Sequence, residues 1–196
     1  RSFSLPVFSD TYSLNESASS RENDFYSLNM NFQHNFNNEG HKLDALIFYS
    51  AEEGSDFENE SEVLTDQQYA KTNMFLDRIS TREYEDENEF RFKLDYTNPF
   101  SENGKLEAGL QSRMERETEE LLFEDFDIVN NRWVENPQFT SSTDFKRDIH
   151  AAYGTFSNKI GEISYMLGLR GELTNREILN SNAVAASTLN RFDLFP

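Results

Sequence analysis

The sequence lacks cysteine altogether. Disulfide bonds, thiolate nucleophiles and thiolate metal sites are therefore excluded, and no redox compartment is indicated. Also missing is any run of apolar residues that approaches the roughly 18 to 20 needed for a membrane-spanning helix. The sequence still allows membrane-spanning β-strands. The strands of an outer-membrane barrel alternate lipid-facing and lumen-facing residues, so their average hydropathy resembles that of soluble proteins.

Basic residues are scarce. Lys and Arg together number 18 against 36 Asp and Glu, which gives a formal net charge of -18. This balance argues against nucleic acid or an anionic membrane surface as the main partner. The 196-residue chain begins at Arg1, so we expect it either to have lost an initiator Met and a leader or to be a piece of a longer polypeptide.

Apolar and polar residues alternate along much of the chain. In residues 90–97 the apolar positions are Phe90, Phe92, Leu94 and Tyr96. After the connection Asn98–Gly104, the apolar residues Leu106, Ala108 and Leu110 alternate with Lys105, Glu107, Gln111 and Arg113. This period of two predicts a β-hairpin with one apolar and one charged face.

Two further hairpins follow the same pattern. Upstream, the expected apolar face holds Tyr26, Leu28, Met30, Phe32 and Phe36 before the turn at 37–40, then Leu43, Ala45, Ile47 and Tyr49. Downstream, it holds Ile149, Ala151 and Tyr153 before a turn at 157–161, then Ile163, Tyr165, Leu167 and Leu169. We therefore expect an all-β fold, an antiparallel meander of long hairpins at about 25–50, 88–115 and 145–175.

The links between the hairpins, about 52–88 and 116–144, are long and acidic. Both exceed the roughly 12 to 15 residues beyond which structureless loops are uncommon, so we expect the strands to continue into them. A short helix at 62–79 is an alternative there. Short turns that alternate with long acidic loops are typical of a transmembrane β-barrel, and Phe36, Phe100 and Phe156 beside the turns suit an interfacial aromatic girdle.

A soluble antiparallel sheet that uses the same Phe residues as its core explains the alternation equally well. Gly109, Gly154 and Gly168 interrupt strand positions. Glycines there favour tilted, curving strands, which supports the barrel over the soluble sheet.

Few residues suggest chemistry. His34, His41 and His150 lack a metal-ligand spacing, so no metal site is predicted. Asp148 and His150 share a strand face, but no nucleophile motif accompanies them, and a hydrolase on a β-scaffold is kept only as a third class. The acidic runs 83–87 and 124–127 lack EF-hand spacing, which leaves calcium binding open.

Trp133, the only tryptophan, is either a ligand platform or, as we expect, an anchor that packs a loop. The sequence thus predicts no catalytic residue, no cofactor-binding residue and no metal ligand. It does not indicate which residues bind a ligand.

Three runs resemble the barrel portion of TonB-dependent outer-membrane receptors, the outer-membrane β-barrel family with a separate plug. They are YTNPFSENGKLEAGLQSR (96–113), DIHAAYGTFSNKIGEISYMLGLRGELTNREI (148–178) and LNRFDLFP (189–196). The shared pieces are Tyr96–Pro99, Gly104–Gly109, Ala151–Tyr153, Gly168–Glu172 and Phe195–Pro196. The resemblance covers roughly residues 25–50, 88–115 and 145–196.

The resemblance implies a Gram-negative outer-membrane location, contact with outer-membrane lipid, and non-catalytic uptake without a cofactor. A small-molecule, glycan or peptide ligand would bind the extracellular loops, and TonB would engage an amino-terminal region of the parent protein. Such receptors have about 22 strands, whereas the sequence offers about six long ones. We therefore expect residues 1–196 to be part of a barrel domain, whose closure by oligomerisation or rearrangement stays open. The rival is a soluble or surface-exposed β-sheet domain that binds a protein or a glycan.

Overall fold

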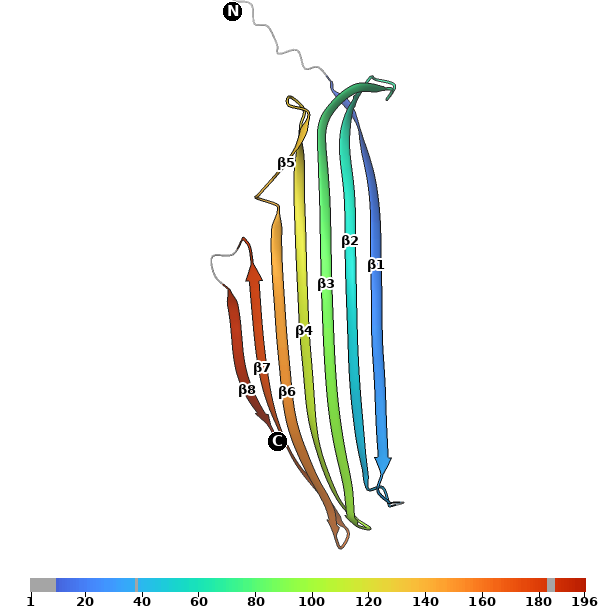
Figure 1. Ribbon diagram of the computed structural model, residues 1–196, viewed down its shortest axis with the longest axis vertical. Coiled ribbons are helices and arrows are strands. Elements are labelled where there is room, and N and C mark those ends of the chain that lie inside the picture. The colour runs from blue at the N-terminus through green and yellow to red at the C-terminus, as the bar shows by residue number, and fades with distance from the viewer. Residues whose placement is uncertain (1–9, 38, 183–185) are drawn as a thin grey trace, which may run out of the picture. The chain divides into compact units, whose positions relative to one another are not determined.

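The computed structural model describes residues 10–37, 39–182 and 186–196 and is all-β (Figure 1). Its strands are β1 (Tyr12–Asn35), β2 (Lys42–Thr65), β3 (Lys71–Ser101), β4 (Gly104–Asp127), β5 (Arg132–Glu135), β6 (Ser141–Ile160), β7 (Ile163–Asn180) and β8 (Ser187–Phe195). One antiparallel sheet follows the chain in the order β1-β2-β3-β4-β6-β7-β8, and β5 pairs with β4. The predicted all-β antiparallel meander is confirmed. Among the described residues, no helix is long and apolar enough to cross a membrane.

The described residues form two compact units. Unit 1 holds those up to Glu22 together with Ser55–Glu83 and Leu121–Ser141. Unit 2 holds the described residues of Asn23–Gly54, Tyr84–Glu120 and Ser142–Pro196. Strands β1 to β4 contribute residues to both units, whereas β7 and β8 belong to unit 2 alone.

The tight turns of unit 2, which follow β1, β3 and β6, lie at one end of its strands (Figure 1). After β1, the Asn37 side-chain oxygen accepts hydrogen bonds from the backbone N–H groups of Glu39 and His41, each at 3.1 Å. Gly40 follows with a φ of 93°, a left-handed conformation that glycine adopts without a steric penalty. Asn38, part of the predicted turn, lies outside the described residues.

The turn predicted at 157–161 is shorter in the structure. Ser157, Asn158 and Lys159 continue β6 and pair with Met166, Tyr165 and Ser164 of β7. Only Gly161, with a φ of 63°, and Glu162 connect the two strands.

The segments 52–88 and 116–144 are mostly strand rather than long loops. β2 continues to Thr65 and β3 begins at Lys71, so the alternative of a helix at 62–79 is wrong. β4 likewise continues to Asp127, and β5 and the start of β6 also lie in the second segment. The predicted continuation of the strands is confirmed, because pairing satisfies the backbone of both partners along their length and overrides the helical propensity of Glu and Leu.

Carboxylates close the turns of unit 1. Asp66 accepts backbone hydrogen bonds from Gln68 at 2.9 Å and Ala70 at 2.8 Å. Asp127 accepts from the Asn130 side chain at 2.6 Å and from its backbone N–H at 3.0 Å. These hydrogen bonds lower the pKa of the Asp127 carboxyl, and the one from the Asn130 side chain has the largest effect.

Polar side chains pair across β1 and β2 in unit 1. Ser13 donates to Glu62 at 2.5 Å, and Ser17 donates to Glu58 at 2.8 Å. Arg21 forms an ion pair with Asp56 at 2.5 Å. These cross-strand pairs stabilise a sheet that gains little from apolar contacts here.

One face prediction is wrong. Ala151 pairs with Glu172 and Tyr153 with Arg170, so Ile149, Ala151 and Tyr153 lie on the charged face of the sheet. The apolar face of β6 instead carries Ala152, Gly154 and Phe156, which pair with Gly171, Leu169 and Leu167. Both sets of alternate residues are largely apolar, so the alternation within β6 could not distinguish them.

An internal apolar core is nearly absent. Within the described ranges, the only buried hydrophobic side chains are those of Val63 and Ala151. Ordinary soluble domains bury many more, since apolar burial is the main favourable term in their folding.

Candidate functional site

The apolar face carries a continuous band in unit 2. We call it the apolar band; it comprises the residues of that face within 26–36, which are the end of β1 and the residue after it, and within 43–51 of β2, 90–100 of β3, 106–114 of β4, 152–160 of β6 and 163–173 of β7. Its side chains are uncovered: Leu28, Leu110 and Leu169 remain 54%, 51% and 56% exposed. Each segment has the roughly 9 to 11 residues that a tilted strand needs to cross the hydrocarbon core of a bilayer.

Polar residues end the apolar band at a matching point on successive strands. The next residues of the apolar face are Asp24, Glu53, Asn88, Arg116 and Asn175. The band therefore has a defined edge, as a lipid-facing surface requires at the membrane–water interface.

Aromatic rings gather at the turn end of the band. Phe100 stacks on Phe156 with centroids 5.4 Å apart. The ring of His41 lies 4.4 Å from that of Phe36, and its Nε2 is 2.9 Å from the Tyr96 hydroxyl oxygen. Rings with a polar edge suit the interface of a bilayer.

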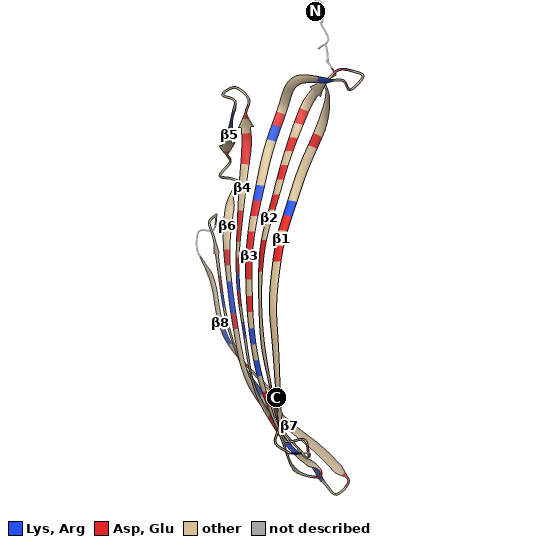
Figure 2. Ribbon diagram, turned by 45° about the vertical axis from the view of Figure 1, so that its right-hand side comes forward, with Lys and Arg blue, Asp and Glu red and all other residues tan. Residues whose placement is uncertain are grey.

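The opposite face carries cations and anions spaced two residues apart along a strand. Same-strand ion pairs at 2.7 to 3.0 Å include Lys42–Asp44, Lys93–Asp95, Lys105–Glu107, Arg170–Glu172 and Arg191–Asp193. Figure 2 shows this mixture of signs along the strands of unit 2. Each such pair is hydrophilic but carries almost no net charge, because its cation and its anion lie close together.

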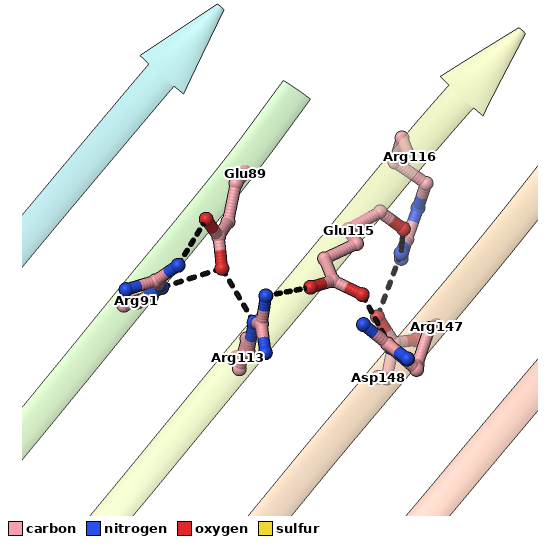
Figure 3. A network of polar contacts seen from close by, with 7 residues as sticks. All are labelled: Glu89, Arg91, Arg113, Glu115, Arg116, Arg147 and Asp148. Atoms are coloured by element: carbon pink, nitrogen blue, oxygen red, sulfur yellow. Dashed lines mark hydrogen bonds and ion pairs between the residues drawn. The ribbon is translucent and has the colours of Figure 1, made fainter. Parts of the chain in front are cut away.

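A network of ion pairs crosses three strands on this charged face (Figure 3). Glu89 of β3 accepts from Arg91 at 2.5 and 2.6 Å and from Arg113 of β4 at 2.5 Å. Arg113 also pairs with Glu115, which pairs with Arg147 of β6. Burial raises the pKa of Glu89, but hydrogen bonds from Arg91 and Arg113 outweigh it, and the pKa is lowered overall.

Nearer the turns, Tyr153 reaches across β4 to β3. Its hydroxyl donates a hydrogen bond to Asp95, and its ring lies over Gly109. Tyr153, Asp95, Lys105 and Glu107 line an open hollow of about 460 Å³ on the charged face.

The hydrolase candidates do not form a triad. Asp148 pairs with Arg116 at 2.8 Å, and His150 Nδ1 lies 3.0 Å from Ser112 Oγ. Asp148, His150 and Arg116 lie on the apolar face at the edge of the band, and Ser112 lies within it. The carboxylate that would orient the histidine is held by an arginine instead, so the arrangement lacks the base-orienting contact of a nucleophilic site.

The other histidines are also separate. His34 lies between the rings of Phe32 and Phe36, and His41 contacts Tyr96. Across the described parts of the chain, no group of His, Asp and Glu side chains could hold a metal ion.

Trp133 packs in unit 1. Its ring lies 5.0 Å from that of Phe126, its partner residue across β4 and β5. The Arg78 guanidinium carbon lies 4.5 Å from the Phe126 ring centroid, 5.2 Å from that of Trp133 and 4.8 Å from that of Phe75. This environment agrees with the expected packing anchor.

The sequence does not predict the network of Glu89, Arg113, Glu115 and Arg147. Its only signal in the sequence is the spacing of opposite charges by two residues, in Glu89–Arg91 and Arg113–Glu115. That spacing puts each pair on one face but does not reveal which strands meet.

A family model described as "Outer membrane protein beta-barrel family" matches residues 34–196. No curated protein matches the chain.

Proposed function

The chain belongs to the outer membrane protein beta-barrel family, and we propose that it forms part of the wall of a TonB-dependent receptor that takes up a ligand. The protein is located in the outer membrane. The step from an outer-membrane barrel to a TonB-dependent receptor is our proposal. It draws on the resemblance of residues 96–113, 148–178 and 189–196.

The observation that carries the proposal is the two-faced strand. One face of unit 2 presents the exposed apolar band, and the other presents ordered ion pairs such as Arg113–Glu115. Lipid solvates the first face, and a water-filled lumen or a polar plug suits the second.

The open edges of the sheet support a larger barrel. Within the described residues, β1 and β8 each have one neighbour, so the sheet is open at both edges. Unpaired backbone groups are costly in hydrocarbon, which means that further strands must pair with these edges. We propose that the parent protein supplies them and that residues 1–196 are a segment of a wide barrel.

The strands are also longer than a strand needs to be to cross a membrane. After Ala51, the charged residues of β2 are all acidic: Glu52, Glu53, Asp56, Glu58, Glu60 and Glu62. We propose that these continuations are extracellular and contact a small-molecule, glycan or peptide ligand. TonB would engage an amino-terminal region of the parent protein.

The rival function was a soluble or surface-exposed sheet domain whose apolar stripe is its core. In the described residues only Val63 and Ala151 are buried hydrophobics, which argues against such a core. A non-catalytic role is also supported by the pairing of Asp148 with Arg116.

The test uses the complete parent protein. It should fractionate with the outer membrane, migrate differently on gels with and without heating, and co-purify with the periplasmic domain of TonB. Membrane fractionation without TonB binding would overturn the receptor proposal while leaving the barrel intact. Full solubility without detergent would contradict both.

A further inference from the structure

Three guanidinium groups on the charged face share two carboxylates. We call Arg91, Arg113 and Arg147 the arginine row; Glu89 and Glu115 hold it in place (Figure 3). The two carboxylate side chains are only 9% and 8% exposed, whereas those of the row are 46%, 36% and 37% exposed. The row therefore keeps one positive charge that its own glutamates do not neutralise, and its groups reach solvent.

The row retains unused hydrogen-bond donors. In the part of the chain that the structure describes, Arg113 uses Nε and Nη2 for the two glutamates, and Arg147 uses Nε for Glu115. The ring of Phe48 lies 5.1 Å from the Arg91 guanidinium carbon, and that of Phe145 lies 5.7 Å from the Arg147 one. Guanidinium groups held from two sides present a fixed fork, which matches the geometry of a carboxylate.

Carboxylates occupy the next positions of the charged face. Glu87 precedes Glu89 by two residues and Glu117 follows Glu115 by two, a spacing of about 7 Å along a strand. Burial and the neighbouring Glu117 and Glu52 raise the pKa of Glu87, so these carboxylates act on one another. These carboxylates would repel a ligand that carries only a negative charge. A ligand that also carries a positive charge would not be repelled in this way.

We propose that the arginine row binds the carboxylate of a zwitterionic ligand, a short peptide, whose ammonium group lies against Glu52, Glu87 and Glu117. The site rests on the proposed function, since it takes the charged face to line the lumen of an uptake protein. Within that function it names the ligand as peptide rather than glycan.

The test is calorimetric titration of the complete parent protein in detergent micelles with alanyl-alanine, whose charges lie at opposite ends. The two matched probes are its N-acetyl and its C-terminal amide derivatives. Removal of either charge removes a charge-assisted contact and should weaken binding about tenfold or more. Equal affinity for all three probes, or no saturable binding, overturns the proposal.

Variants assign the binding to the row. Arg147→Gln should lower the affinity for alanyl-alanine about tenfold. It should leave the affinity for the C-terminal amide unchanged, because the amide has no carboxylate that Arg147 could bind. Arg116→Gln, on the opposite face of the same sheet, is the control and should change neither. An equal loss in both variants contradicts the site.

Folding is checked by heat-modifiable migration on gels. If Arg147→Gln does not fold, Arg147→Lys replaces it as the test variant. Lysine keeps the positive charge but lacks the guanidinium fork, so the affinity for alanyl-alanine should be several-fold lower than in the original protein. Unchanged binding in Arg147→Lys would then count against the row. Because membrane fractionation and TonB co-purification are separate measurements, the peptide site can fail while the receptor proposal stands.

Discussion

The ring of Tyr153 on β6 lies directly over Gly109 on β4, so close that a Cβ atom at position 109 would come within 2.5 Å of it. The glycine leaves the space through which the tyrosine reaches β3 and donates its hydrogen bond to Asp95. The missing side chain at position 109 thus makes room for the Tyr153 ring on the charged face, where it covers the glycine.

Tyr153→Phe should lower the free energy of unfolding by about 1 kcal/mol, because it removes one donor to a carboxylate that also pairs with Lys93. The measurement is urea unfolding of the parent protein in lipid vesicles. Tyr165→Phe, on the apolar face of β7, is the matched control. If both variants have the same stability as the original protein, the Tyr153–Asp95 hydrogen bond contributes nothing.

Adjacent residues of β4 should differ sharply in their tolerance of charge. Leu110 lies in the middle of the apolar band and is 51% exposed, whereas Gln111 lies on the charged face. Leu110→Arg should cost about 2 to 4 kcal/mol because the guanidinium would sit in hydrocarbon, and Gln111→Arg should cost less than 1 kcal/mol. Equal costs in vesicle unfolding would show that lipid does not cover the Leu110 face.

The stability contributed by Glu87 should depend on pH. Its pKa is raised by burial and by Glu117 and Glu52, so folding disfavours the ionised form. The penalty is absent below the ordinary pKa of glutamate, about 4.3, and grows as pH rises through the raised value. Glu87→Gln should therefore be more stable than the original protein at pH 7 and equal to it at low pH. Unfolding midpoints across pH test this, and a larger gain at low pH would contradict it.

Trp133 can report on unit 1, because it is the only tryptophan. Arg78→Ala removes the guanidinium that lies between the rings of Phe75, Phe126 and Trp133. The expected cost is about 1 kcal/mol, with greater quenching of Trp133 fluorescence by acrylamide. Arg132→Ala, which removes a charge from the neighbouring residue of β5, serves as the control. Unchanged quenching in Arg78→Ala would mean that the arginine does not cover the indole.

The sequence by itself determined the strands, their hairpins and most of their faces, because alternation and turn residues act locally. Phe90 to Tyr96 and Leu106 to Leu110 lie on the apolar face as predicted. The tertiary structure decided the face of β6, since alternate residues on both sides of that strand are largely apolar and only the register with β7 separates them. It also decided the contacts of Glu89 and Glu115. These buried carboxylates pair with arginines on neighbouring strands, and the register between two strands cannot be read from the sequence of either strand alone.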